Sequence, residues 1–346
     1  MAYTTINKST DNFNTKLYTG NATQRTIDVG FQPDLVWGKL RSTTGNHWLW
    51  DSIRGANYYL KSNATDGNNT GGGQDLNGFV SNGFTVGTGT RMNTNSETMA
   101  SWNWKAGTGQ GSSNTDGSIN TTYTSVNTTA GFSISKWSGS GYNATIGHGL
   151  GVAPKMVIVK RLTGVADWVV GHDSMGWTKY IYLSSTAAQV DSASAAWNDT
   201  APTNSVFTVA TNTQVNASGS DYVAYCFAEK TGYSKFGSYV ANGSSTNATF
   251  TYTGFAPKFV MIKRITSADH WVMNDSTRST NENNNTLKAN SSDAEYTSTA
   301  YGIDLLSNGF KPYTSDGNYN ANGDTYIYMA FGQSLVGSNN VPCTAR

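Results

Sequence analysis

The chain has 346 residues, enough for two or three compact units, since ordinary domains hold about 100 to 200 residues. Only 13% of its residues are charged, and 23 cationic side chains nearly balance 22 acidic ones. Disorder driven by charge repulsion is therefore excluded, and electrostatic binding of nucleic acid or of an anionic membrane surface is not expected. With 12% aromatic residues, the chain has apolar surface to bury.

The N-terminus, Met1 to Lys8, lacks the cationic start and the apolar run of a secretory signal. No stretch approaches the roughly 20 apolar residues that span a bilayer, so we expect a chain made and kept in a cytosol, without membrane insertion. Cys226 lies in an apolar run and predicts core packing, whereas Cys343 near the tail is interpreted as an incidental thiol. Two such different cysteines predict neither a disulfide framework nor a metal site.

One phrase occurs three times along the chain. The copies start at Gly30, Gly151 and Gly254 and run as GFQPDLVWGK, GVAPKMVIVK and GFAPKFVMIK. Glycine and proline predict a turn that fixes the entry angle, and the residues after proline are apolar enough for a strand covered on both faces. The recurrence indicates three internal repeats.

Each copy continues through the same features in the same order. A tryptophan follows the proline by 14 or 15 residues. After it come a leucine, then a turn followed by a phenylalanine, and finally an aromatic strand that closes the repeat. Two of these turns carry Asn-Gly, a strong hairpin signal. The residues predicted for the repeat cores are Pro33, Trp48 and Phe84, then Pro154, Trp168 and Phe207, then Pro257, Trp271 and Phe310.

At least six short strand candidates per roughly 100 residues indicate an all-β fold of tandem β-sandwich domains, of jelly-roll or lectin-like type. We place the first repeat at 1–105, the second at 131–232 and the third, with a C-terminal tail, at 233–346. Residues 106–130, rich in Gly, Ser, Thr and Asn, predict a flexible linker that leaves the first domain independent. The alternative is an arm that pairs with a neighbouring domain or subunit. Helix is expected for one or two turns at most, within 184–197.

No catalytic residue, metal site or cofactor is predicted. Asp51, Asp173 and Asp275 follow the three repeat tryptophans, and carboxylates that return in every copy are interpreted as turn formers. Asp66 and Asp316 begin Asp-Gly-Asn triplets that could offer oxygen ligands to a cation, but neither fits a known calcium loop, so turn formation is favoured.

The four histidines, His47, His148, His172 and His270, show no ligand spacing and are assigned structural roles, with His47 and His270 at equivalent places before the repeat tryptophans. Tryptophan and tyrosine beside polar residues can stack on sugar rings, although they also fill sandwich cores and subunit interfaces. The candidate surface contacts are the aromatic residues outside the repeated pattern: Trp177, Tyr180, Tyr313 and Tyr319.

The sequence also resembles a known kind of module. Residues 113–119, 127–134 and 147–160 are similar to a module widespread in virion proteins of marine tailed phages, including cyanophages, and Trp102-Asn103-Trp104-Lys105 and the strand at 222–227 match the same pattern. The resemblance covers roughly residues 12–335. Such modules are usually domains of unknown function in tail-fibre, tail-associated or capsid-surface proteins, and the resemblance implies a jelly-roll or lectin-like sandwich without a known catalytic residue.

From this resemblance we expect a non-enzymatic structural protein of a bacteriophage virion, associated with the tail or its fibres and made in the bacterial host's cytoplasm. It would form a homo-oligomer, for instance a trimer, bind other virion proteins and contribute to host attachment, with a host surface glycan as a further partner. One alternative is a capsid decoration or head-fibre protein. A second is a polysaccharide-degrading tail enzyme, which is disfavoured because most acidic residues lie in turns.

Overall fold

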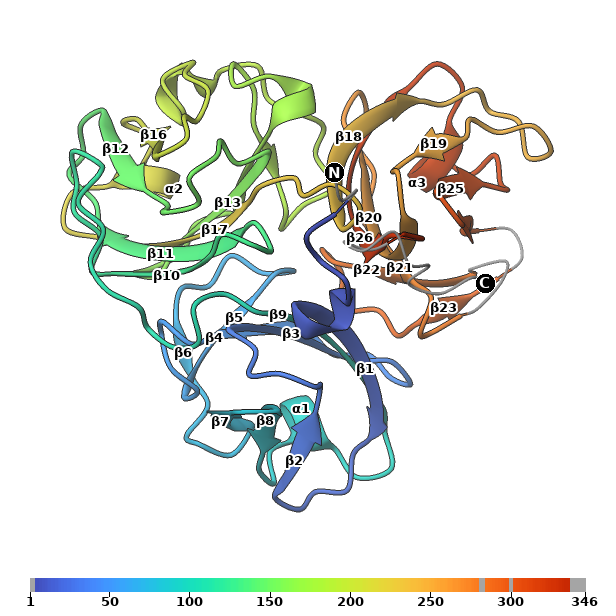
Figure 1. The fold of residues 1–346 in the computed structure, drawn as a ribbon, viewed down its shortest axis with the longest axis horizontal. Coiled ribbons are helices and arrows are strands. Elements are labelled where there is room, and N and C mark those ends of the chain that lie inside the picture. The colour runs from blue at the N-terminus through green and yellow to red at the C-terminus, as the bar shows by residue number, and fades with distance from the viewer. Residues whose placement is uncertain (1–3, 280–283, 299–300, 337–346) are drawn as a thin grey trace.

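In the computed structural model, which describes residues 4–279, 284–298 and 301–336, three copies of one β-unit surround a common centre (Figure 1). Each copy contains a large six-stranded sheet and a small sheet of two or three strands, and every strand pair is antiparallel. The predicted all-β fold of β-sandwich units from three internal repeats is therefore confirmed.

The large sheets place the closing strand of each repeat between its opening strand and the strand of the Gly-Pro phrase. The first sheet has the order β1 (Phe13–Thr19), β9 (Thr98–Trp104), β3 (Leu35–Leu40), β4 (His47–Asp51), β5 (Tyr58–Lys61) and β6 (Asn69–Thr70). The second has β10 (Tyr123–Asn127), β11 (Phe132–Ser138), β17 (Asp221–Phe227), β13 (Met156–Arg161), β14 (Val169–His172) and β15 (Ile181–Tyr182). The third has β18 (Ser234–Val240), β26 (Thr325–Gln333), β20 (Ala256–Arg264), β21 (Trp271–Asp275), β22 (Asn285–Lys288) and β23 (Tyr296–Thr297).

A small sheet covers one face of each large sheet. These sheets consist of β2 (Arg25–Asp28), β8 (Gly83–Val86) and β7 (Leu76–Val80), of β12 (Ala144–Gly147) and β16 (Val206–Val209), and of β19 (Thr251–Tyr252), β25 (Gly309–Pro312) and β24 (Ile303–Leu306). Among the described residues, helix is limited to single turns: η1 (Ser9–Asp11), α1 (Thr90–Asn93), η2 (Asp173–Met175), η3 (Ala193–Ala195), α2 (Thr213–Asn216) and α3 (Gly317–Asn320). No helix in the described ranges is long and apolar enough to cross a membrane.

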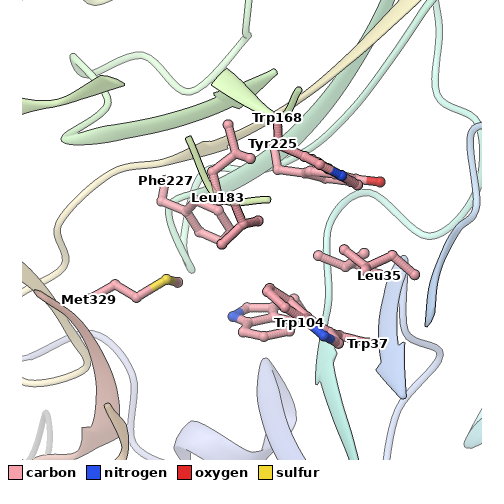
Figure 2. A pocket seen from close by; sticks show the side chains of 10 residues that line it. Leu35, Trp37, Trp104, Trp168, Leu183, Tyr225, Phe227 and Met329 are labelled. Carbon is pink, nitrogen blue, oxygen red and sulfur yellow. The ribbon is translucent and has the colours of Figure 1, made fainter. Parts of the chain in front are cut away.

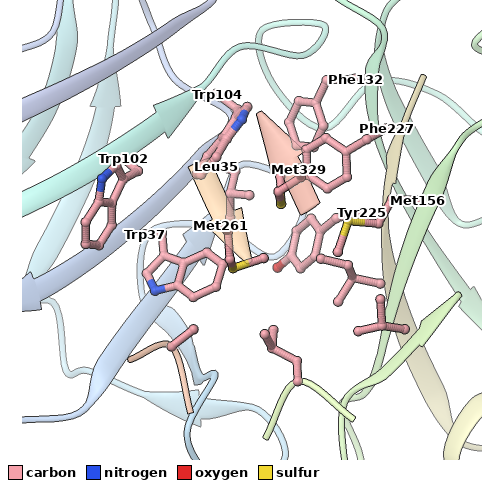
Figure 3. Packing of buried hydrophobic residues seen from close by; sticks show 14 of the residues in the cluster. Leu35, Trp37, Trp102, Trp104, Phe132, Met156, Tyr225, Phe227, Met261 and Met329 are labelled. Atoms are coloured by element: carbon pink, nitrogen blue, oxygen red, sulfur yellow. The ribbon is translucent and has the colours of Figure 1, made fainter. Parts of the chain in front are cut away.

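Four hydrophobic clusters hold the units together. Three lie inside the individual sandwiches, and the fourth lies where the other faces of the large sheets meet (Figure 3). At its centre the last aromatic residues of the closing strands touch one another: the ring centroids of Trp104 and Phe331 are 5.8 Å apart, those of Phe227 and Phe331 6.0 Å, and those of Trp104 and Phe227 6.4 Å. The first repeat therefore shares a core with the other two. Strand β3 is buried along its whole length, as the sequence predicted for a strand covered on both faces.

All the residues predicted for the repeat cores are buried, namely Pro33, Trp48, Phe84, Pro154, Trp168, Phe207, Pro257, Trp271 and Phe310. Cys226 is also buried in β17, as expected for core packing, and Cys343 lies outside the described residues. Burial raises the pKa of the Cys226 thiol.

The strand register corrects the alignment of the first repeat by one residue. His47 pairs with the last residue of the Gly-Pro phrase, the place that Trp271 has in the third repeat. Trp48, which the sequence aligned with Trp168 and Trp271, lies one position later and on the opposite face of the sheet, because side chains alternate along a strand. Trp48 therefore packs inside its own sandwich, whereas the other two pack in the central core. The predicted equivalence of His47 and His270 is wrong for the same reason.

The segment 106–130, predicted as a linker or an arm, lies against the first and second repeats. Its strand β10 extends the second large sheet by pairing with β11, and Ile119 forms a parallel bridge with Ile146 of β12. At its start, three backbone N–H groups between Ala106 and Gly109 donate to the buried carboxylate of Asp34 at 2.7 to 3.0 Å. In this structure the segment pairs with neighbouring repeats of its own chain.

Candidate functional site

Two of the carboxylates singled out in the sequence form buried ion pairs at the ends of equivalent strands. Asp51 Oδ2 lies 2.6 Å from Arg54 Nε, and Asp275 Oδ2 lies 2.5 Å from Arg278 Nε. In both, the other carboxylate oxygen accepts the backbone N–H of the same arginine, so a tight turn brings the two side chains together. Burial by itself would lower the pKa of both arginines, but the adjacent carboxylates raise it, so the guanidinium groups stay charged.

Each ion pair also contacts the next repeat around the centre. Tyr225 of the second repeat donates its hydroxyl to Asp51 at 2.7 Å, and Trp102 of the first repeat donates its indole N–H to Asp275 at 3.0 Å. Tyr225 and Trp102 occupy the same register position in their closing strands. Burial, and then the charge of Asp51, raise the pKa of Tyr225 well above its ordinary value, so its hydroxyl remains a donor.

The second repeat completes this ring with a neutral residue. His172 lies at the strand position that Asp51 and Asp275 occupy, and burial lowers its pKa to about 4. Its Nδ1 accepts the N–H of Ser174 at 3.1 Å, so its Nε2 carries the proton and donates to the carbonyl of Tyr328 in the third repeat, 3.2 Å away. The third predicted carboxylate, Asp173, lies one residue later and pairs with Lys155 near the surface, at 2.8 Å.

Three equivalent buried lysines, which the sequence analysis did not identify, add contacts at two of the junctions, while Lys39 Nζ donates to the carbonyl of Leu40 in its own repeat. They are the last residues of the repeated phrase, Lys39, Lys160 and Lys263, and burial lowers the pKa of each to about 8. Lys160 Nζ donates to the carbonyl of Thr65 in the first repeat at 2.8 Å, and Lys263 Nζ donates to that of Thr186 in the second repeat at 2.9 Å. A lysine recurs at the end of the repeated apolar phrase in every copy, and this recurrence could have identified the three residues. A cation at a buried strand position needs hydrogen-bond acceptors inside the protein.

The first and third repeats close the circle through charged residues. Arg41 makes a bidentate contact with Glu295, with Nη2 2.6 Å and Nε 3.1 Å from its oxygens. Arg278 Nη1 contacts the same carboxylate at 2.9 Å, and the N–H of Gly45 donates to the carbonyl of Ser292 at 2.9 Å. All three junctions between repeats are thus bonded within one chain.

The remaining polar candidates have local structural contacts. Asp66 pairs with Lys61, and Asp316 accepts the N–H of Asn318 at 2.9 Å at the start of α3. His47 Nδ1 accepts the indole N–H of Trp37 at 2.9 Å, and burial lowers its pKa well below its ordinary value. Among the residues that the structure describes, no three His, Cys, Asp or Glu side chains lie close enough to hold a metal ion.

The other two histidines lie in similar settings. His148 Nδ1 accepts the N–H of Leu150 at 3.1 Å, and burial lowers its pKa. His270 Nδ1 lies 3.3 Å from the side-chain oxygen of Asn290. Burial also lowers the pKa of His270, with a further contribution from the charge of Lys288.

The prediction of surface contacts is wrong for three of its four residues, because Trp177, Tyr180 and Tyr319 are buried; Tyr313 is partly buried. The Trp177 ring lies over Gly171, where a Cβ atom would come within 2.3 Å of it, and packs edge-on against Trp197. Tyr319 contacts Thr286 through its hydroxyl at 2.7 Å. Aromatic residues outside the repeated pattern were expected at the surface, but these three rings fill interior space whose shape differs from one sandwich to the next.

The strongly exposed aromatic residues lie elsewhere. Tyr142 is 77% exposed and Tyr252 57%, and Phe250 and Tyr296 also lie at the surface. Phe250 and Tyr252 alternate with threonines, and such alternation predicts a strand with one face open. This was the signal that sequence reasoning missed.

A cavity of about 10 Å³ lies where the three repeats meet, between apolar side chains of Leu35, Trp37, Trp104, Tyr225, Phe227 and Met329, among others (Figure 2). The polar atoms of Trp37 and Tyr225 are already bonded to His47 and Asp51. The indole N–H of Trp104 has no hydrogen-bond partner among the described residues, but a buried water needs about two to four polar partners, so a cavity of this size holds neither a stable water nor a ligand. We interpret it as a small packing gap in the central core.

The chain matches a model of a protein family. A family model described as a domain of unknown function, DUF7483, matches residues 8–334. No curated protein and no solved structure matches the chain.

Proposed function

We propose that this chain, which belongs to the DUF7483 family of domains of unknown function, is a non-enzymatic structural protein of a bacteriophage virion, associated with the tail or its fibres. In this proposal the protein is homo-oligomeric, binds other virion proteins and contributes to host attachment. The proposal rests on the resemblance to virion modules of marine tailed phages carried by residues 113–160.

The observation that carries the non-enzymatic part is the closed ring of repeat junctions. The buried ionic side chains Asp51, Arg54, Asp275 and Arg278 are engaged with each other or with the next repeat. A group that acts as a general acid, base or nucleophile needs access to a substrate. These groups face the interior, where a satisfied polar network makes a unit rigid.

Labelling of intact particles tests the proposal. Gold-conjugated antibodies against this chain should decorate the tail or fibres of virions of the phage that encodes it. Absence of the chain from purified virions, by labelling and by mass spectrometry, would overturn the proposal. Signal over the head at hundreds of copies per particle would instead support the capsid decoration or head-fibre alternative.

An activity assay separates this proposal from the enzymatic alternative. The purified chain, incubated with envelope polysaccharide of the host, should release no reducing sugar above a heat-denatured control. Release that is abolished by replacement of a single Asp or Glu would establish a polysaccharide-degrading enzyme and refute the non-enzymatic assignment.

A further inference from the structure

The small sheets of the three repeats begin with equivalent edge strands. In β2, β12 and β19, Ile27, Ile146 and Thr251 each pair with the repeat phenylalanine of the neighbouring strand. Each of these three strands lies at the end of its sheet. An edge strand exposes backbone donors and acceptors to any passing strand, so proteins usually guard such edges.

The first repeat guards its edge with charge. Arg25 and Asp28 are the first and last residues of β2, and Asp28 is exposed while its carboxylate accepts the N–H of Gly30 at 2.8 Å. The Arg25 guanidinium donates to the carbonyl of Thr19 and lies 5.5 Å from the ring centre of Tyr18. A second strand would have to displace or desolvate these charges, which disfavours pairing.

The second repeat covers its edge with the chain itself. Ile119 donates its N–H to the carbonyl of Thr145 at 3.1 Å, and the N–H of Thr145 donates to Ser118 Oγ at 2.8 Å. Both backbone groups of Thr145 therefore point outward from the sheet edge. The same edge accepts an extended segment in this fold.

Within the part of the chain that the structure describes, the third repeat has neither charged residues nor a covering segment at this edge. Its edge reads Thr249-Phe250-Thr251-Tyr252-Thr253, without a charge, and it lies at the end of the sheet β19-β25-β24. Phe250 corresponds to Thr145, since each directly precedes the residue that pairs with the repeat phenylalanine. Phe250 directly precedes β19 (Thr251–Tyr252), and by this correspondence its backbone groups would point away from β25, towards the edge that the described residues leave uncovered.

Two aromatic rings stand on the outer face beside this edge. Thr251 points inward and is 6% exposed, whereas Phe250 is 44% and Tyr252 57% exposed. The Phe250 ring lies over Gly309, where a Cβ atom would come within 2.7 Å of it, and Leu306 pairs with the same glycine. The edge therefore adjoins a continuous apolar surface made by Phe250, Tyr252 and Leu306.

We propose that this edge binds the same edge of a second copy of the chain, with antiparallel pairing around a twofold axis at Thr251. The sequence around Thr251 reads the same in both directions apart from the exchange of Phe and Tyr. A twofold axis there places Phe250 opposite Tyr252 of the partner subunit, twice, with the backbone groups that point outward forming the ladder. Cross-strand aromatic pairs stabilise antiparallel sheets, so self-pairing satisfies both the backbone and the rings.

This inference specifies the contact that would make the protein homo-oligomeric. It rests on the homo-oligomeric part of the proposed function and not on the location of the protein in a virion. Particle labelling tests where the chain resides, and solution measurements on the purified chain test the contact. The failure of one is therefore distinguishable from the failure of the other.

Sedimentation velocity of the full chain from about 1 to about 100 µM should show a monomer–dimer equilibrium. Tyr252→Lys introduces the charge that guards natural edges and should weaken dimerisation at least about tenfold. Tyr142→Lys, at the 77% exposed tyrosine of the second repeat, is the matched control and should leave the equilibrium unchanged. A wild-type chain that stays monomeric, or equal effects of both substitutions, would overturn the inference.

A covalent trap tests the register. In a Cys343→Ser background, the double variant Phe250→Cys/Tyr252→Cys should form a disulfide-linked dimer under mild oxidation, because directly opposite residues lie within disulfide range. Each single variant should form no disulfide-linked dimer, because its two cysteines would be diagonal neighbours about 7 to 8 Å apart. Covalent dimers from the single variants, or none from the double variant while the wild type dimerises, would refute the twofold axis at Thr251.

Discussion

Replacement of Asp51 by alanine should destabilise the whole chain strongly. The carboxylate binds Arg54 Nε at 2.6 Å, the Arg54 N–H at 2.8 Å and the Tyr225 hydroxyl at 2.7 Å, and the Asp51 and Arg54 side chains are at most 1% exposed. Without Asp51 the guanidinium remains buried with only neutral partners. Removal of one partner of a buried ion pair costs about 3 to 5 kcal/mol, and the orphaned tyrosine hydroxyl keeps the cost in the upper part of that range. A loss of this size is a large share of the about 5 to 15 kcal/mol that stabilises an ordinary domain.

Urea unfolding followed by tryptophan fluorescence measures the effect as a lower midpoint at unchanged slope. Asp173→Ala is the control, since its pair with Lys155 is about 40% exposed and should contribute less than about 1 kcal/mol. The double variant Asp51→Leu/Arg54→Met should recover most of the loss, because both buried charges leave together. An Asp51→Ala cost no larger than that of Asp173→Ala would refute the reasoning that buried charge locks the repeats.

Three further outcomes follow from the described contacts. Limited proteolysis of the folded chain should spare residues 107–130, since β10 and the Asp34 contacts pack this segment; early cleavage there, mapped by mass spectrometry, would contradict that packing. The free energy of unfolding should rise as pH increases from about 8 to about 9.5. The buried lysines have pKa values of about 8 in the folded chain and 10.5 in the unfolded chain, so the unfolded chain binds more protons in this window. The thermal midpoint of Lys160→Met should therefore rise less steeply with pH than that of the wild type, and an equal slope would exclude the lysine contribution. Asn320→Ala should cost about 1 to 3 kcal/mol in urea unfolding, because its buried amide donates to the carbonyls of Ser244 and Thr314 at 2.9 and 2.8 Å; Asn318→Ala, a partly buried neighbour, serves as the comparison and should cost less.

Three equivalent asparagines have a structural role that the sequence does not reveal. Asn93, Asn216 and Asn320 are the last residues of the α-helical turns α1, α2 and α3 and are fully buried. Each bonds to the loop that follows the opening strand of its repeat, as Asn216 does by accepting the Ser140 N–H at 2.9 Å. In an asparagine-rich chain, nothing local separates these three from the many asparagines in exposed turns.

The sequence by itself determined the strands, their turns and the threefold repetition. These depend on short-range properties: glycine and proline break the chain, and β-branched and aromatic runs favour extended backbone. The repeated prolines and phenylalanines were assigned to cores because their apolar side chains recur at fixed places in every copy. Such signals lie within a few residues of one another and need no knowledge of what packs against them.

Only the tertiary structure decided how the repeats share a centre and which side chains reach solvent. The meeting of Trp104, Phe227 and Phe331 joins strand ends that lie more than 100 residues apart along the chain. The burial of Trp177 depends on the absence of a side chain at Gly171, and the exposure of Tyr252 depends on its place in β19, at the end of a sheet whose outer edge no described strand covers. Burial is a property of the space around a residue, and that space is filled by segments distant in sequence, so the pattern of one strand does not contain it.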